Sequence, residues 1–235
     1  MKLQTLLEQA LQSRIELFSR KFPVKVFHNF STCQVQDLSQ DFNIEIDPEV
    51  IPFKNQSLDL ALSAGPIMFT NDIPGVLKQW YAALKPGGVF MAAFFGENSL
   101  IELKDCFLSA EEKLNIPHTL RFAPTIATKD AGMLMQRADF HSPTADRTHQ
   151  LFQVQSLSEI LNSLKAMGGN ILHERSTTRL SKEFLKVVEA EYHKRYASET
   201  KLNVTIDIVC MTGWAIERYT DERIHQQTTK SIGYI

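Results

Sequence analysis

The sequence has 235 residues, with 25 Lys and Arg against 27 Asp and Glu, and a formal net charge of -2. This balance excludes nucleic acid as a favoured ligand, because no bulk positive charge attracts a polyanion. The hydrophobic share of 43% can fill a substantial core. No apolar run in the sequence approaches the ~20 residues of a membrane span, so we expect no span.

A helix is predicted at the N-terminus. Apolar residues recur at helical spacing over residues 2–20, and Pro23 ends the pattern. The segment contains Glu8 and Glu16 and lacks a continuous apolar run, so it is typical of neither a secretory signal nor a transit peptide.

The cysteines predict a reducing compartment. Their number is odd and no CxxC spacing occurs, so buried thiols are expected rather than disulfides or metal ligands. The three residues are Cys33, Cys106 and Cys210. We therefore expect a cytoplasmic protein.

Short strands and helices then alternate. Strands are predicted at residues 24–27, 43–46 and 58–62. Asn71 and Asp72 offer a cap for a helix that ends at the Lys-Pro-Gly-Gly turn. The apolar run VFMAAFF that follows is typical of a buried parallel strand.

The second half continues the alternation. Ser99, with Glu102 three residues later, predicts a capping box at the start of a helix over 99–114. The remaining expected elements are helices at 128–138, 157–167 and 181–196, extended chain at 142–154, and a long strand at 202–216. This order predicts an α/β domain with a mostly parallel sheet over residues 1–220, opening with a helical segment at 1–22 and followed by a polar tail at 221–235.

The central stretch resembles the class I S-adenosylmethionine-dependent methyltransferases. It reads LDLALSAGPIMFTNDIPGVLKQWYAALKPGGVFMAAFFG, with their order of strand, loop, helix, Leu-Lys-Pro-Gly-Gly turn and strand. The preceding IEIDPEVIPFKNQSLDLAL is similar to the segment that flanks the adenine of the cofactor. The resemblance implies that Asp47 and Pro48, with Ser63 and Ala64 on the next strand, are vestigial or weak cofactor contacts. An Asp47 that merely caps a turn is the alternative.

More narrowly, the chain from about residue 44 onward resembles the branch of the biotin-synthesis malonyl-carrier O-methyltransferases and the arginine hydroxylase-like assembly factors of mitochondrial complex I. The matching segments are NDIPGVLKQWYAALKPGGVF, FFGENSLIELKDCFLSAEE, RFAPTIATKDAGMLMQRADF, LKAMGGN and TIDIVCMTGWAIE, with HQQ near the end. The resemblance implies a Rossmann-like sheet with a late antiparallel strand. In the complex I factors it implies arginine hydroxylation rather than methyl transfer.

The glycine-rich cofactor loop of this family is missing. Small residues normally follow the first strand, where backbone amides approach the methionine part of the cofactor. Here the segment reads KFPVKVFHNFSTCQVQDLS, and the first glycine of the chain is Gly65. About twenty residues separate Val26 from Asp47, too few for a loop, a crossover helix and a second strand.

Two contractions explain this length. Either the crossover helix is lost and residues 34–38 are its remnant, or the first strand and helix are lost and VKVFHNF is the old second strand. The Arg-Lys-Phe-Pro lead-in favours the first.

Other candidate site residues are few. Asp37 is the one acidic residue placed to replace the ribose-binding carboxylate, with a surface turn as the alternative. Met68 and Phe69 stand where the family has a His-Trp pair. Tyr192 and His193 could face a cleft or simply a solvated helix face. The histidines have no metal-ligand spacing, so we predict no metal site.

These observations predict a degenerate methyltransferase-like protein with little or no S-adenosylmethionine affinity. It would act through a protein partner in a respiratory-complex assembly type of role. Its catalytic residues, if any, are unknown. The partner surface is expected at an exposed remnant of the cofactor cleft, lined by Ile44, Ala64, Ile67, Met68 and Phe69.

Two alternatives stay open. In one, the protein is an active methyltransferase in which His28, Asn29 and Ser31 form an unusual loop and Asp47 holds adenine. In the other, the chain derives from a truncated gene and a partner subunit completes its sheet.

Overall fold

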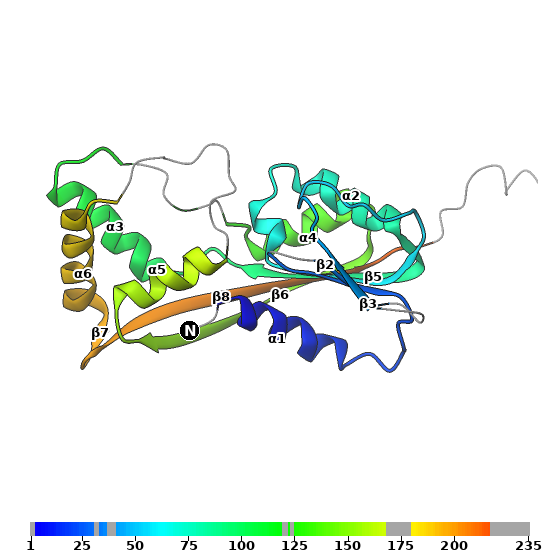
Figure 1. Ribbon diagram of the computed structural model, residues 1–235, viewed down its shortest axis with the longest axis horizontal. Helices are drawn as coiled ribbons and strands as arrows, with labels where there is room; N and C mark the ends of the chain where they lie inside the picture. Colours follow the sequence, from blue (N-terminus) through cyan, green and yellow to red (C-terminus); the bar gives the residue numbers. More distant parts are fainter. Residues whose placement is uncertain are drawn as a thin grey trace, which may run out of the picture.

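A strongly twisted sheet runs through the molecule, as the computed structural model shows (Figure 1). The structure describes residues 3–30, 33–36, 41–118, 122, 125–167 and 180–216. The strands are β1 Lys25–His28, β2 Cys33–Gln36, β3 Asp41–Ile44, β4 Leu58–Ala64, β5 Leu84–Phe95, β6 His141–Val154, β7 Ala197–Ser198 and β8 Lys201–Trp214. The helices are α1 Leu3–Ile15, α2 Ile73–Ala83, α3 Ile101–Lys113, α4 Thr128–Arg137, α5 Leu157–Ala166 and α6 Lys182–Tyr196, with a 3-10 turn η1 Pro66–Phe69.

The strand order is that of a Rossmann-like sheet with an antiparallel end. Among the described residues the order is β3-β2-β1-β4-β5-β8-β6, with β7 paired to β8. The first five positions follow the doubly wound order. β1, β4 and β5 are parallel, whereas β8 runs antiparallel to β5 and β6. The predicted Rossmann-like α/β class and late antiparallel strand are therefore confirmed. The expectation of a mostly parallel sheet is wrong, because among the described strands only β1 with β4 and β4 with β5 pair in parallel.

The contracted N-terminal part of the sheet is an antiparallel meander. β2 pairs antiparallel with both β1 and β3, so hairpins replace the helical crossovers. The prediction of a helix remnant at 34–38 is wrong, because Cys33–Gln36 alternates buried and exposed side chains as a strand. β1 pairs directly with β4, which favours retention of the first strand and loss of the crossover. The third strand begins two residues earlier than predicted, at Asp41.

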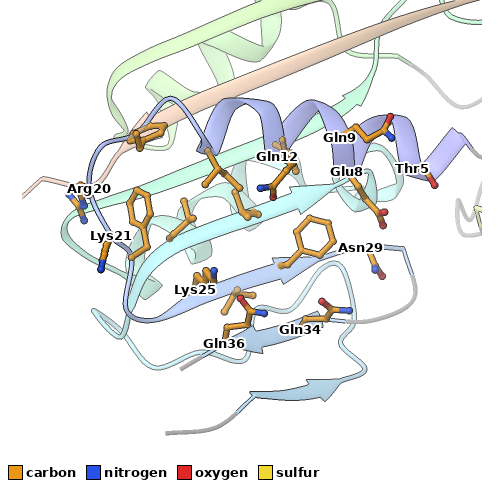
Figure 2. A pocket seen from close by; sticks show the side chains of 18 residues that line it. Thr5, Glu8, Gln9, Gln12, Arg20, Lys21, Lys25, Asn29, Gln34 and Gln36 are labelled. Atoms are coloured by element: carbon orange, nitrogen blue, oxygen red, sulfur yellow. The ribbon is translucent and has the colours of Figure 1, made fainter. Parts of the chain in front are cut away.

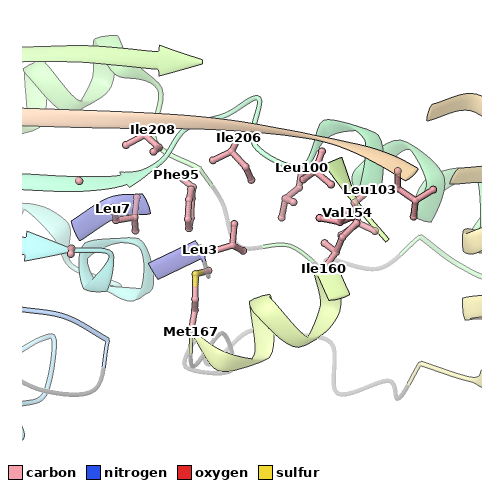
Figure 3. Packing of buried hydrophobic residues seen from close by; sticks show 14 of the residues in the cluster. Leu3, Leu7, Phe95, Leu100, Leu103, Val154, Ile160, Met167, Ile206 and Ile208 are labelled. Carbon is pink, nitrogen blue, oxygen red and sulfur yellow. The ribbon is translucent and has the colours of Figure 1, made fainter. Parts of the chain in front are cut away.

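Helices cover the sheet unequally (Figure 1). α2 and α4 pack on one face, over a core that includes Trp80 and Phe90. α1 lies on the other face, against β4, β5 and β8. α3, α5 and α6 surround the far ends of β8 and β6, and Figure 3 shows how residues of α1, α3 and α5 meet the sheet there. This second core includes Leu7, Leu103 and Ile206.

Two predicted helix ends differ from the structure. α1 ends at Ile15 rather than residue 20, because Phe18 turns away to pack against Trp214. The capping box is wrong, since the side chain of Ser99 bonds the backbone of β8 and Glu102 is the acceptor for Thr205. The Asp72 cap of α2 and the other predicted helices are confirmed. The polar tail predicted from residue 221 lies outside the described residues.

Candidate functional site

The carboxyl ends of β1, β3, β4 and β5 lie along one edge of the sheet, because these strands run in the same direction. Open α/β sheets bind ligands at this edge, beside the point where the strand order reverses. That point lies between β1 and β4. The segments that follow these two strands therefore form the candidate site.

The ring of Phe30, two residues beyond β1, rests on Gly65, which follows β4. A Cβ atom added to Gly65 would lie 1.9 Å from Cζ of Phe30. Gly65 has a φ of 101°, a conformation that glycine adopts without strain. Phe30 also packs edge-on against Phe69, with ring centroids 5.5 Å apart. An aromatic ring thus fills the space beside the end of β4.

The sequence predicted an exposed remnant of the cofactor cleft at the end of β4, and the described residues form no such exposed surface there. Its five predicted lining residues are buried or half-buried: Ala64, Ile67, Phe69, Ile44 and Met68. The ring of Phe30 covers this end of β4, and the sulfur of Met68 accepts a hydrogen bond from the N–H of Phe95 at 3.2 Å. The prediction of an exposed surface here is therefore wrong.

Ser63 and Ala64 are interior residues of the sheet. Ser63 is 2% exposed and lies between His28 of β1 and Ala92 of β5 in the register. Ala64 has no exposed surface. Their assignment as cofactor contacts stays a prediction.

His28 is a buried histidine at the end of β1. It is 4% exposed, its ring lies 6.0 Å from that of Trp80, and its Nδ1 atom has no hydrogen-bond partner. Burial lowers the pKa of His28 to about 4, so the imidazole is neutral near neutral pH. A neutral, unpartnered ring can serve as an apolar side chain but not as a cation for a bound carboxylate.

Asp47 is exposed and already forms a turn after β3. Its Oδ1 atom accepts a hydrogen bond from the N–H of Glu49 at 2.9 Å. The carboxylate of Glu49 in turn accepts from the backbone and side-chain N–H groups of Asn71. These bonds bring Asp47 and Pro48 to the segment that follows η1. Asp37 lies outside the described residues.

A buried carboxylate on β8 was not foreseen. Asp207 has no exposed surface, and its Oδ1 atom lies 2.7 Å from Nδ1 of His149 on β6. Nη1 of Arg147 lies 3.6 Å from Oδ2, and Ser99 bonds the Asp207 backbone in both directions. The available signal was an acidic residue within the apolar alternation of residues 204–211. The side chains of Arg147 and His149 are 45% and 62% exposed, so this cluster connects β6, β8 and the segment after β5 as a structural contact.

The remaining candidates have structural positions. Tyr192 is buried and donates to the carbonyl of Asn203 at 2.8 Å, while His193 is exposed. Within the described ranges, no group of three His, Cys, Asp or Glu could hold a metal ion. All three cysteines are buried and unpaired, as predicted.

The fold and this edge of the sheet define a methyltransferase-type domain. Residues 24–92 match the family model described as "Methyltransferase domain". A candidate methyltransferase from Bacillus halodurans has a similar solved structure, with a TM-score of 0.55, 12% identity, and 88% of this chain and 98% of that chain covered. At this identity the likeness supports the fold alone.

Among curated proteins, the chain is similar to the mitochondrial arginine-hydroxylase NDUFAF5 of Mus musculus. The two are 31% identical over 173 residues, which cover 73% of this chain and 50% of the relative. The malonyl-[acyl-carrier protein] O-methyltransferase of Xylella fastidiosa is 30% identical over 192 residues, covering 80% of this chain and 63% of the relative. The chain thus spans about half the length of the hydroxylases it matches. None of the helices in the described ranges is long and apolar enough to cross a membrane.

Proposed function

We propose that this protein is a methyltransferase-like domain that binds S-adenosylmethionine weakly or not at all and acts through a protein partner. The observation that carries this proposal is the ring of Phe30 against Gly65. The family resemblance puts the methionine part of the cofactor at this junction of β1 and β4. A ring in van der Waals contact with the glycine leaves no room there for a second group.

The connection between the strands supports the same conclusion. Four residues join β1 to β2, and none of them is a glycine. A parallel crossover would need a dozen or more residues and would begin a helix whose N–H groups could face an anion. A hairpin supplies no such helix.

The residues present therefore do not fit the cofactor in the position that the family implies. Ser63 and Ala64 have almost no accessible surface, and the carboxylate of Asp47 is engaged in its own turn. No reaction step through the cofactor follows from these residues. The nearly neutral imidazole of His28 offers no charge to replace the missing contacts.

The partner role rests on the relatives. A protein that keeps the family fold without the cofactor half-site would act through contacts between its surface and another protein, because the fold alone does not fix the function. The resemblance to the assembly factors of complex I, together with relatives named arginine-hydroxylase NDUFAF5, favours a respiratory-complex assembly type of role for this chain. Buried, unpaired cysteines fit a reducing compartment, and we infer a cytoplasmic location.

An active methyltransferase is the second candidate. It is favoured by the match to a malonyl-[acyl-carrier protein] O-methyltransferase over 80% of this chain. In that case Asp47 would hold adenine and Phe30 would leave Gly65 when the cofactor binds.

Calorimetric titration with S-adenosylmethionine and S-adenosylhomocysteine separates the two candidates. We expect no saturable heat at micromolar concentrations. Phe30→Ala should raise any residual affinity by opening the space beside Gly65, whereas Phe152→Ala, a control on β6, should leave it unchanged. Micromolar binding by the unaltered chain, lost in Asp47→Ala, would instead establish the second candidate.

A further inference from the structure

A groove lies between α1 and the meander, on the face of the sheet opposite α2. It encloses about 780 Å³ and is lined by residues of α1, β1, β2 and β4, together with residues 18–22 (Figure 2). The hairpins leave this face without the helices that a parallel crossover would have supplied. A volume of this size is typical of sites for small molecules.

The floor of the groove is apolar. Phe27 of β1 lines it beside Leu60 and Leu62 of β4, and Ile15 and Phe18 line the side formed by the end of α1. The alternation of β1 explains this, because Phe27 points to the groove while its neighbours in the strand, Val26 and His28, are buried towards α2. Phe27 is only partly buried. Apolar surface is therefore available to a ligand.

One end of the groove is basic. Figure 2 shows Arg20, Lys21 and Lys25 gathered there. Arg20 donates to the carbonyl of Gly87 at 2.8 Å. The two lysines have no hydrogen-bond or ion-pair partner among the residues that the structure describes, so their ammonium groups are free for an anion.

The opposite end carries less charge. Glu8 lies there, and its carboxylate already accepts a hydrogen bond from Nε2 of Gln4 at 2.8 Å. The walls between the ends bear the amides of Gln12, Gln34 and Gln36, which are neutral donors and acceptors. The charged side chains that line the groove are thus Arg20, Lys21 and Lys25 at one end and Glu8 at the other. This distribution favours a ligand with an anionic group at the basic end.

We propose that this groove binds an amphipathic anion, with a carboxylate, sulfonate or phosphate group at Lys21 and Lys25 and an apolar body against the partly buried side chains of Phe27, Ile15 and Phe18. Lys25 and Asn29, which line the groove at either end of β1, are four residue steps or about 13 Å apart, so the body is an extended chain or a small ring system. The site lies between α1 and the meander, on the face of the sheet opposite α2, and binding there does not require loss of cofactor binding.

Dodecyl phosphate, below its micelle concentration, is the probe for calorimetric titration of the full chain. We expect saturable binding of one molecule. Dodecyltrimethylammonium has the same tail and the opposite charge, and we expect it to bind at least tenfold more weakly. Equal affinity for the two probes would overturn the proposal, as would the absence of saturable binding of the phosphate.

A charge reversal locates the site. Lys21→Glu with Lys25→Glu should weaken dodecyl phosphate binding at least tenfold. The matched control, Lys78→Glu with Lys129→Glu, makes the same change of charge on exposed residues of α2 and α4 and should leave the affinity unchanged. An equal loss in both double variants would show a response to net charge alone and would contradict the site.

Sedimentation with anionic phosphatidylglycerol vesicles distinguishes a lipid surface from a free amphiphile. A groove with room for a single ligand between α1 and the meander predicts binding of the monomeric probe and no cosedimentation. Binding to vesicles without binding of the monomer would overturn the proposal. Because the two lysines are exposed, unfolding midpoints of the variants should match that of the parent chain, which excludes loss of the fold as the cause.

Discussion

Replacing Gly65 by Ala tests the packing at the end of β4. The φ of Gly65 is 101°, and an L residue with positive φ costs about 1–2 kcal/mol. The new methyl group would also lie 1.9 Å from a ring atom of Phe30, so the ring must move. The free-energy cost of this clash is at most the cost of moving the Phe30 ring out of its contact with residue 65 and into solvent. For a partly buried phenylalanine the expulsion is worth about 1–2 kcal/mol.

A double-mutant cycle separates the two contributions. Gly65→Ala should lower the free energy of unfolding by about 2–4 kcal/mol in the unaltered chain. In a Phe30→Ala background the clash is absent, and only the backbone cost of about 1–2 kcal/mol remains. The expected coupling is therefore about 1–2 kcal/mol.

Urea unfolding is the assay, followed by the fluorescence of the two tryptophans, of which Trp80 is 1% exposed. Equal costs of Gly65→Ala in the two backgrounds, within about 0.5 kcal/mol, would refute the contact between Phe30 and Gly65. With that contact, the proposal of a filled cofactor position would lose its main support.

Three further outcomes are expected. Because burial holds the pKa of His28 at about 4 against 6.5 in the unfolded chain, protonation favours the unfolded state, and stability should be full above pH 6.5 and fall by about 3 kcal/mol towards pH 4; in His28→Leu that part of the fall should be missing from urea unfolding curves measured across the same range. Burial raises the pKa of each of the three cysteine thiols to about 12, so a thiol reagent such as dithionitrobenzoate should react with none in the native chain and with all three in denaturant, and fast native labelling would contradict this burial. Tyr192→Phe removes the hydrogen bond to the carbonyl of β8 and should cost about 1 kcal/mol in unfolding free energy; an unchanged value would mean that the hydroxyl finds water instead.

The sequence was sufficient for most of the fold from β4 onward. Long apolar or alternating runs, such as residues 89–95 and 202–216, can bury their side chains only as strands inside the sheet. The local pattern and the tertiary structure therefore agree there. The meander was harder. Cys33–Gln36 carried a two-residue alternation, yet four residues are too few to decide against a helix remnant without the strands on both sides.

The candidate site depended more on contacts between distant residues. The absent glycine loop could be read directly, because glycine has no substitute where backbone must approach a ligand. The burial of Ile67 and Phe69 could not, since it results from Phe30 folding over Gly65 across a gap of 35 positions in the chain. Likewise Ser99 follows an ordinary capping pattern, but β8 competes for its hydroxyl.

The sequence by itself determined the α/β class, the family resemblance, the late antiparallel strand and the loss of the glycine-rich loop, because each depends on local pattern or on residues present or missing. The tertiary structure alone decided that hairpins replace the crossovers and that the ring of Phe30 covers Gly65 at the end of β4. It also decided that a groove with one basic end lies between α1 and the meander. These features arise from side chains and strands that meet only after folding, and no local pattern records which of them will touch.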